Sequence, residues 1–337
     1  MSDVKTGPTA TARELGKEYP PAGEDAALEQ LRALHLEGQN AQPGGAQQRG
    51  EHPKQHAGLW ARLRVESDLP APLRRGLFAE PRSYTALVRH SNGRAFDDRL
   101  PDVHGMAVKV LRPRPGDDGG APLQQDFILA DHPVFFARSV QHIYDFLLAT
   151  ATGTPPGQLA MTTHPQLVHF TSVPKSSLLG MTFWSQTPYR LGDGAVKYLA
   201  IPTAGHEPPA IALNPSPNAL REALIEQLTL RKIPARFDLC VQPQTDADAM
   251  PIEDPTIGWT SAPVRVATLS IYPQKFDSPE QLAFFESLSW TPWNALPEHL
   301  PLGGINRARR KVYEDSSALR HKTTGVAPVS PTGRESF

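Results

Sequence analysis

Residues 301–321, PLGGINRARRKVYEDSSALRH, contain the side chains around which the chain is organised. Two glycines loosen the chain at the start of this stretch, and from residue 305 onward the composition favours a helix. On such a helix Arg309 and Tyr313 lie four residues apart on one face, and Arg320 falls on that face about two turns further along. The stretch therefore predicts a helix that presents a tyrosine between two arginines.

This spacing has a chemical interpretation and a structural one. A guanidinium group one turn from Tyr313 favours the phenolate over the phenol, and a tyrosine oxygen is one of the few protein ligands of haem iron. Arg320 would then suit a haem propionate. The structural alternative is a basic surface helix with one aromatic residue at its edge, and on this stretch alone that alternative is favoured.

The composition is that of an ordinary globular protein, with 337 residues, 39% of them hydrophobic and 20% charged. The formal net charge of −1 gives no broad electrostatic case for binding nucleic acid or an acidic membrane. The single cysteine, Cys240, excludes an internal disulfide and fits a reducing compartment. Because no apolar run reaches the ~20 residues of a membrane span and no signal-peptide core is present, we expect a cytoplasmic protein.

The hydrophobic pattern predicts many short strands and a smaller number of helices. Residues 59–66 alternate between apolar and polar side chains, as a half-buried strand does. Further strands are predicted at 84–89, 105–111, 125–130, 167–171, 181–185, 195–201, 237–242 and 264–272, and helices at 24–37, 134–149, 221–230, 279–288 and 305–321. Hairpin-linked strands with helices collected late favour an α+β fold, an antiparallel barrel with helices outside it, although a sandwich fits nearly as well.

Several polar residues near the predicted strand ends are candidates for chemistry. His52 lies in RGEHPK at residues 49–54, ahead of the first strand, where it could act as general base and then general acid or be an exposed loop histidine. His52 and His56 form only a weak metal-binding pattern. Ser91 could be a hydrogen-bonding partner or a turn residue. The sequence contains no phosphate-binding glycine loop, no GxSxG and no zinc-protease spacing.

Taken in order, these stretches resemble the catalase family of haem proteins over residues 49–321. The matching motifs are Arg49-x-x-His52, Val88-Arg89-His90-Ser91, HGMAVKV at 104–110, Pro133-Val134-Phe135-Phe136 and Arg309-x-x-x-Tyr313, followed by Arg320. The middle and end of the chain look closer to short catalase-like haem proteins than to full-length catalases.

The resemblance implies an eight-stranded antiparallel β-barrel with surrounding helices, and haem b bound between barrel and helices. It implies that Tyr313 binds the iron and is kept anionic by Arg309. His52 would move the peroxide proton, oriented by Ser91, and Phe135 would wall the distal pocket. The propionates would be held by Arg49, Arg89 and Arg320.

Two departures from the family pattern concern the distal side. Where the family has an asparagine, this chain has Ala130 or Asp131, and a carboxylate at Asp131 accepts a hydrogen bond rather than donating one. We include Asp131 among the candidate catalytic residues. Glu51 stands beside His52 where the family often has a small or β-branched residue, and we expect it to point outward because a buried unpaired carboxylate is costly.

The implied function is a haem-dependent oxidoreductase acting on hydrogen peroxide or organic hydroperoxides, a catalase-related peroxidase. One alternative at the same haem site is a fatty-acid hydroperoxide isomerase or lyase resembling allene oxide synthase. A long apolar tunnel beside His52 and Phe146 would favour this alternative. A non-enzymatic haem-binding protein is the third possibility, and a homo-oligomer is left open. The implied organisation is an arm and helix at 1–45, a barrel with the distal haem side at 46–275, and helices with the proximal ligand at 276–337.

Overall fold

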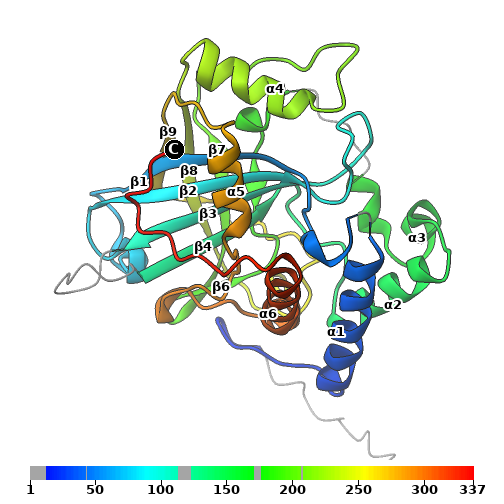
Figure 1. The fold of residues 1–337 in the computed structure, drawn as a ribbon. Coiled ribbons are helices and arrows are strands. Elements are labelled where there is room, and N and C mark those ends of the chain that lie inside the picture. The colour runs from blue at the N-terminus through cyan, green and yellow to red at the C-terminus, as the bar shows by residue number, and fades with distance from the viewer. Residues whose placement is uncertain (1–12, 43, 113–122, 171–175, 206–207) are drawn as a thin grey trace, which may run out of the picture.

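One antiparallel sheet dominates this computed structural model, which describes residues 13–42, 44–112, 123–170, 176–205 and 208–337 (Figure 1). Its strands are β1 (Gln55–Val65), β2 (Ser83–Asn92), β3 (His104–Arg112), β4 (Leu123–Ala130), β5 (Phe183–Trp184), β6 (Tyr189–Leu191), β7 (Gly194–Pro202), β8 (Ala235–Pro243) and β9 (Val264–Ile271). Their order in the sheet is β5-β4-β3-β2-β1-β9-β8-β7-β6.

A further pairing closes the sheet into a barrel. Phe183 and Trp184 of β5 lie opposite residues 200 and 199 of β7, which joins the two ends of the sheet. The strand β6 forms a short hairpin on β7. The closed ring therefore contains eight strands, so the predicted antiparallel barrel with helices outside it is confirmed and the sandwich alternative is wrong. Closure also removes the unpaired edges of an open sheet.

The strands carry the barrel core on their inner faces. Leu59 and Leu63 of β1 are fully buried, whereas Arg62 and Arg64 on the other face are exposed, as the alternating pattern predicts. On β2 from Leu87 onward and on most of β3 the outward-facing residues are buried as well, where helix α5 (Pro279–Ser287) and the segment after it cover them. These strands thus have a second, outer layer, and the candidate site lies in that layer.

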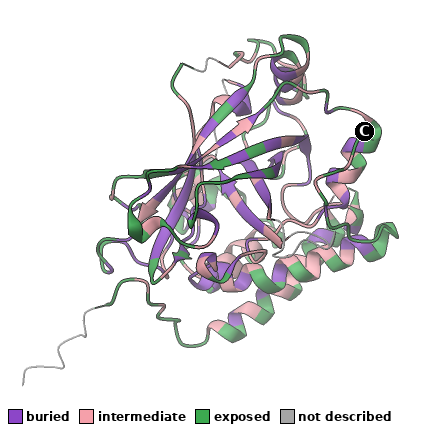
Figure 2. Cartoon of the chain, turned by 90° about the vertical axis from the view of Figure 1, so that its left-hand side faces the viewer, coloured by how far each residue is buried: buried purple, intermediate pink, exposed green. Residues whose placement is uncertain are grey.

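The longest helix, α6 (Gly304–Thr324), lies outside the barrel with α1 (Glu24–Ala41) and α2 (Val140–Ala151) packed beside it (Figure 1). The three helices share a small apolar cluster that includes Leu31, Val140 and Val312. The remaining α-helices are α3 (Pro156–Thr162) and α4 (Ala219–Ile225), and the π-helix η6 (Glu226–Leu230) follows α4 directly. Figure 2 shows the helices burying one side and exposing the other. None of the described helices combines the length and apolarity needed to cross a bilayer.

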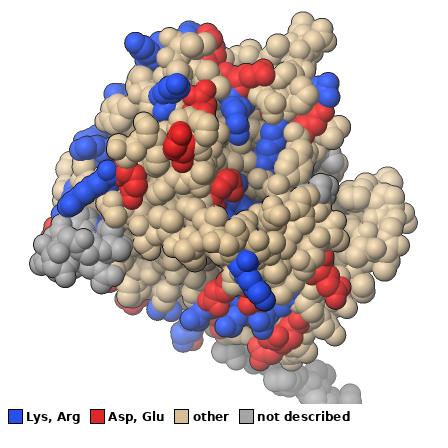
Figure 3. All heavy atoms as spheres, in the orientation of Figure 1, with Lys and Arg blue, Asp and Glu red and all other residues tan. Residues whose placement is uncertain are grey.

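An ion-pair cluster fixes the start of α6 to the N-terminal segment. Arg307 on α6 binds three carboxylates, with Nε 2.6 Å from Glu24 and Nη2 2.7 Å from Glu253, and also pairs with Glu18. The described part of the predicted N-terminal arm that precedes α1, residues 13–22, is therefore held against the body, whereas residues 1–12 lie outside the described residues. Basic and acidic side chains are interspersed over the face drawn in Figure 3, and neither sign dominates it.

The prediction of a strand at 167–171 is wrong. Residues Pro165–Phe170 form a 3-10 helix, η4, beside α3, and residue 171 lies outside the described residues. This segment belongs to the helical layer, where no described strand is placed to pair with it. Helix α2 also begins later than predicted, because Ser139 caps it by accepting a hydrogen bond from the backbone N–H of residue 142.

A buried ion pair joins the outer layer to the barrel. Lys109 on β3 donates to both carboxylate oxygens of Asp126 on β4, at 2.7 and 2.8 Å, and both side chains are buried. Asp126 also accepts hydrogen bonds from Thr291 N and Asn294 Nδ2, each at 3.1 Å. The pair therefore holds the segment after α5 against the barrel.

We expect Lys109→Met to lower the free energy of unfolding by about 3–5 kcal/mol, because it leaves the Asp126 carboxylate buried without its cation. Urea unfolding followed by circular dichroism measures this. Lys311→Met is the matched control, since Lys311 pairs with Glu314 on the surface of α6 at 3.3 Å and its side chain is 52% exposed. That exposed pair should contribute at most about 1 kcal/mol, and equal effects of the two substitutions would contradict the prediction.

Candidate functional site

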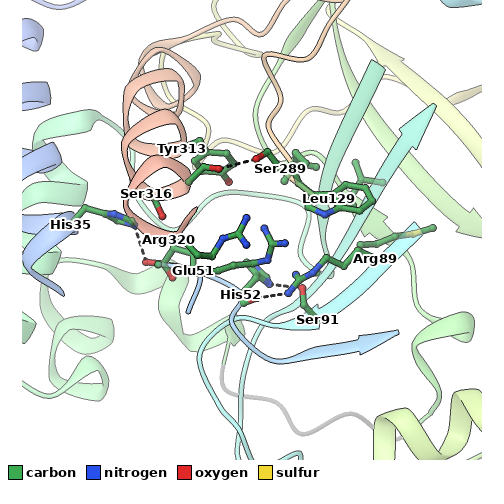
Figure 4. A pocket seen from close by; sticks show the side chains of 18 residues that line it. His35, Glu51, His52, Arg89, Ser91, Leu129, Ser289, Tyr313, Ser316 and Arg320 are labelled. Carbon is green, nitrogen blue, oxygen red and sulfur yellow. Dashed lines mark hydrogen bonds and ion pairs between the residues drawn. The ribbon is translucent and has the colours of Figure 1, made fainter. Parts of the chain in front are cut away.

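A cavity lies between the outer layer of β2–β4 and helix α6 (Figure 4). Its volume is about 110 Å³ and it opens to solvent, so it is smaller than the ~300–1,000 Å³ typical of small-molecule and cofactor sites. Its apolar walls include Ala107, Ile128, Leu129 and Trp290. Six of the residues proposed from the sequence as catalytic, cofactor-binding or metal-ligating line this one cavity: Arg49, His52, Arg89, Ser91, Tyr313 and Arg320.

His52 reaches the cavity from the segment that precedes β1. Its φ of 56° places it in the left-handed region, which is uncommon for a residue with a side chain. Backbone hydrogen bonds hold this conformation, because the N–H donates to Gly93 O at 2.9 Å and the carbonyl accepts from Arg89 Nη2 at 2.9 Å. The ring Nδ1 lies 3.1 Å from Ser91 Oγ, as the predicted orienting role of that serine requires (Figure 4).

Burial lowers the pKa of His52, and the carboxylates of Asp102 and Glu51 act against this shift without reversing it. The imidazole is therefore neutral at neutral pH. When Nδ1–H donates to Ser91 Oγ, Nε2 is left with a lone pair that can accept a proton.

Gly105 on β3 makes room for this pair. A Cβ at residue 105 would lie 2.7 Å from His52 Nδ1 and 2.9 Å from Ser91 Oγ, closer than real side chains pack. Gly105→Ala is therefore expected to displace the imidazole and to slow any reaction in which His52 Nε2 accepts a proton. The predicted cost in folding stability is about 1–3 kcal/mol, the usual range for overpacking. Gly157→Ala, where nothing lies within 4 Å of the added Cβ, is the control, and equal activity of the two variants would contradict the assignment.

Tyr313 lies across the cavity from His52, on α6 (Figure 4). Arg309 precedes it by one turn of the same helix, and its Nη1 donates to Thr187 Oγ1 at 3.2 Å and Asn306 Oδ1 at 3.4 Å. The Arg309 guanidinium also lies 5.3 Å from the ring centroid of Phe135. Arg309 and Phe135 are thus neighbours of each other, and neither is among the residues that line the cavity.

Three arginines meet around Glu286 at one edge of the cavity. Glu286 was not among the residues predicted from the sequence. Arg89 donates to Glu286 Oε1 and Arg49 to Glu286 Oε2, each at 3.2 Å, and Arg320 donates to the Glu286 carbonyl at 2.6 Å. Burial lowers the pKa of Arg89 and of Arg320 to about 10 each. Burial alone would raise the pKa of Glu286, but Arg49 and Arg89 outweigh it and leave this pKa below its usual value. With three guanidinium groups and one carboxylate, the cluster has a net charge of +2.

The two carboxylates of the distal side have partners. Asp131 lies outside the cavity lining and binds His104, with Oδ2 2.6 Å from Nδ1 and Oδ1 2.9 Å from the backbone N–H. Glu51 does line the cavity, but its Oε1 accepts from Arg94 Nη2 at 2.7 Å, and Arg94 is 65% exposed. Glu51 therefore faces both the cavity and the solvent.

The structure resembles three solved catalases along nearly its whole length. A fungal catalase aligns with 98% of this chain and 70% of its own, with a TM-score of 0.66 and 17% identity. A bacterial catalase aligns with 100% and 71%, with a TM-score of 0.63 and 17% identity. Catalase A from Saccharomyces cerevisiae aligns with 96% and 71%, with a TM-score of 0.64 and 16% identity.

The chain has the catalase fold. At this level of identity the likeness establishes the fold, whereas the chemistry must be argued from the side chains. No family model matches the sequence, and neither does any curated protein.

The residues of the cavity suit a haem in this catalase fold. Tyr313 offers an oxygen ligand on one side, the apolar walls suit a porphyrin, and the net charge of the arginine cluster matches two propionates. In the described part of the chain no group of three or more histidine, cysteine or carboxylate side chains could hold a bare metal ion. A haem iron would need only one ligand from the protein, because the porphyrin nitrogens would supply the others.

Proposed function

We propose that this protein is a haem-dependent oxidoreductase that reduces hydrogen peroxide or organic hydroperoxides, a catalase-related peroxidase. The observation that carries the proposal is a single cavity with Tyr313 on one side and the His52–Ser91 pair on the other. The proposed cofactor is haem b, with Tyr313 as iron ligand and its propionates held by Arg49, Arg89 and Arg320.

The mechanism follows from what these side chains can do. The haem, when bound, supplies the electrons that cleave the O–O bond. His52 Nε2 accepts the proton from the hydroperoxide and returns it to the oxygen that leaves as water or alcohol. Ser91 and Gly105 keep the imidazole in position for this transfer. The balanced turnover is ROOH + 2 e⁻ + 2 H⁺ → ROH + H₂O, with the electrons taken from a one-electron donor such as a phenol.

Two observations favour peroxidase turnover among the alternatives. The Asp131 carboxylate is committed to His104, so the chain offers no amide donor at this position, and we infer that rapid dismutation is disfavoured. Phe146 packs against Phe136, at a centroid distance of 4.9 Å, and lies outside the cavity lining. A tunnel for lipid hydroperoxides beside Phe146 is therefore not part of the proposal.

The test begins with a titration of the purified protein with haemin, which should produce a Soret band that saturates at one haem per chain. Hydrogen peroxide, cumene hydroperoxide and linoleic acid hydroperoxide are then each supplied with and without a phenolic donor. Consumption that depends on the donor supports the proposal. Oxygen release from hydrogen peroxide, or donor-independent loss of the fatty-acid hydroperoxide, would replace it with dismutation or isomerisation. Haem binding without turnover would leave a haem carrier, and no haem binding would overturn the whole assignment.

A further inference from the structure

The N-terminal helix contributes a second histidine to the cavity. His35 on α1 lines it, and its side chain is only 11% exposed. Its Nδ1 is buried without a hydrogen-bond partner among the described residues, which is costly for a polar atom. Its Nε2 lies 3.9 Å from Glu51 Oε1 (Figure 4). A buried imidazole with a free nitrogen beside a carboxylate can pass on a proton.

Gly50 allows the His35 ring to occupy this place. A Cβ at residue 50 would lie 2.5 Å from His35 Cε1 and 3.1 Å from Ser316 Oγ, so any larger residue would displace the imidazole. Gly105 leaves space for the His52 ring in the same way. His35 from α1 and His52 from the segment before β1 therefore both reach this cavity, each against a glycine.

Glu51 connects His35 with the solvent. Its side chain is 38% exposed, and its partner Arg94 lies in the exposed turn after β2. The separation of 3.9 Å from His35 is longer than a hydrogen bond, so transfer requires the Glu51 carboxylate to rotate. Its partial exposure permits that rotation and gives water access to its other oxygen.

The proposed turnover requires such a connection. His52 returns to the leaving oxygen the same proton that it took from the hydroperoxide, so it adds none. The balanced turnover consumes two further protons together with the two electrons, and these protons must enter the cavity from solvent. The cavity therefore needs a route for proton uptake that is separate from His52.

Resting on the proposed function, we propose that His35 and Glu51 form the route by which protons pass from solvent into the cavity during the donor-dependent half of turnover. Glu51 takes a proton from water and passes it to His35, whose side chain lines the cavity and releases the proton there. The charged groups that act on His35 are Glu51 and, more weakly, Arg94, while α6 presents the uncharged Ser316. Burial lowers the pKa of His35 and Glu51 opposes that shift, so the imidazole releases its proton readily.

The first measurement does not depend on haem. Ring titrations of the histidines by two-dimensional NMR on the haem-free protein compare wild type with Glu51→Gln. The titration midpoint of His35 is expected to fall in the variant, because the carboxylate that favours its charged form is gone. Glu29→Gln, on the same helix but paired with Arg32 at the surface, is the control and should leave the midpoint unchanged. An unchanged midpoint in Glu51→Gln would overturn the proposed coupling.

The second measurement separates the two halves of turnover by stopped-flow. His35→Gln and Glu51→Gln should leave the reaction with hydroperoxide at its wild-type rate and slow the donor-dependent phase by about 10²-fold, the lower end of the range for proton transfer by a placed side chain. The solvent deuterium effect on that phase should increase. Gly50→Ala should act like His35→Gln, whereas His142→Gln, stacked on His164 outside the cavity lining, should not.

The possible failures can be told apart. Wild-type rates in both phases of His35→Gln and Glu51→Gln would overturn the proton route. Equal slowing of both phases with loss of haem would also overturn it, since it would show a purely structural role. If the wild-type protein binds haem but does not react with hydroperoxide, the proposed function fails, while the NMR titration still reports whether His35 and Glu51 are coupled.

Discussion

Replacing Tyr313 by phenylalanine is expected to remove haem binding. The substitution keeps the ring that packs beside the α1, α2 and α6 cluster and deletes only the oxygen proposed to bind the iron. Loss of a group that merely supports a metal ligand costs ~10–100-fold in affinity, so loss of the ligand itself should cost more. Titration with haemin, followed through the Soret band, measures this.

Tyr144→Phe is the control for this substitution. Tyr144 is a partly buried tyrosine of the same helical layer, and it lies outside the cavity lining. Its variant should bind haem as the wild type does, and circular dichroism should show that both variants remain folded. If Tyr313→Phe keeps its haem affinity and its spectrum, Tyr313 is not the ligand and the orientation of the cofactor in this cavity must be reconsidered.

The second large effect is expected at His52. His52→Ala should retain haem, because the proposed ligand and propionate contacts are untouched. It should slow the reaction with hydroperoxide by about 10²–10⁴-fold, the range for removal of a general acid–base group. Stopped-flow mixing of the haem-loaded protein with hydrogen peroxide gives this rate constant directly.

The pH dependence of the same rate constant tests the state of His52. The reaction needs the neutral imidazole, and burial lowers the pKa of His52 below its ordinary value of ~6.5. The rate should therefore stay level as the pH falls from 8 to ~6.5 and decline only at lower pH, where Nε2 becomes protonated. A decline that begins above pH 7, or a wild-type rate in His52→Ala, would remove His52 from the mechanism.

Local patterns in the chain were sufficient for most of the barrel. The alternation of Leu59 and Leu63 with Arg62 and Arg64 follows from the two-residue period of a strand, and a strand at 59–66 was predicted from it. At 167–171 the local pattern was misleading. Whether a short apolar run becomes a strand depends on a pairing partner elsewhere in the chain, and this run lies beside α3.

The candidate site also combines residues that local sequence could indicate with residues that it could not. Tyr313, His52 and Ser91 could be proposed from spacing and motif, because each stands in a recognisable local stretch. Glu286 and His35 could not, since nothing in FFESL or LRALHLEG marks them as different from other helical residues. They matter only because α5 and α1 carry them to the cavity. For Asp131 the sequence position suggested a catalytic role, whereas in the structure its carboxylate is hydrogen-bonded to His104.

By itself, the sequence predicted most of the strand and helix pattern, and its resemblance to catalases suggested the pair His52 and Tyr313, because periodicity and motif spacing are properties of short segments. Only the tertiary structure decided that these two side chains, 261 positions apart, line one cavity. It also decided that three arginines meet at Glu286 and that two glycines leave space for two histidines. These are contacts between distant segments, and closure of the barrel and packing of α6 against it determine them.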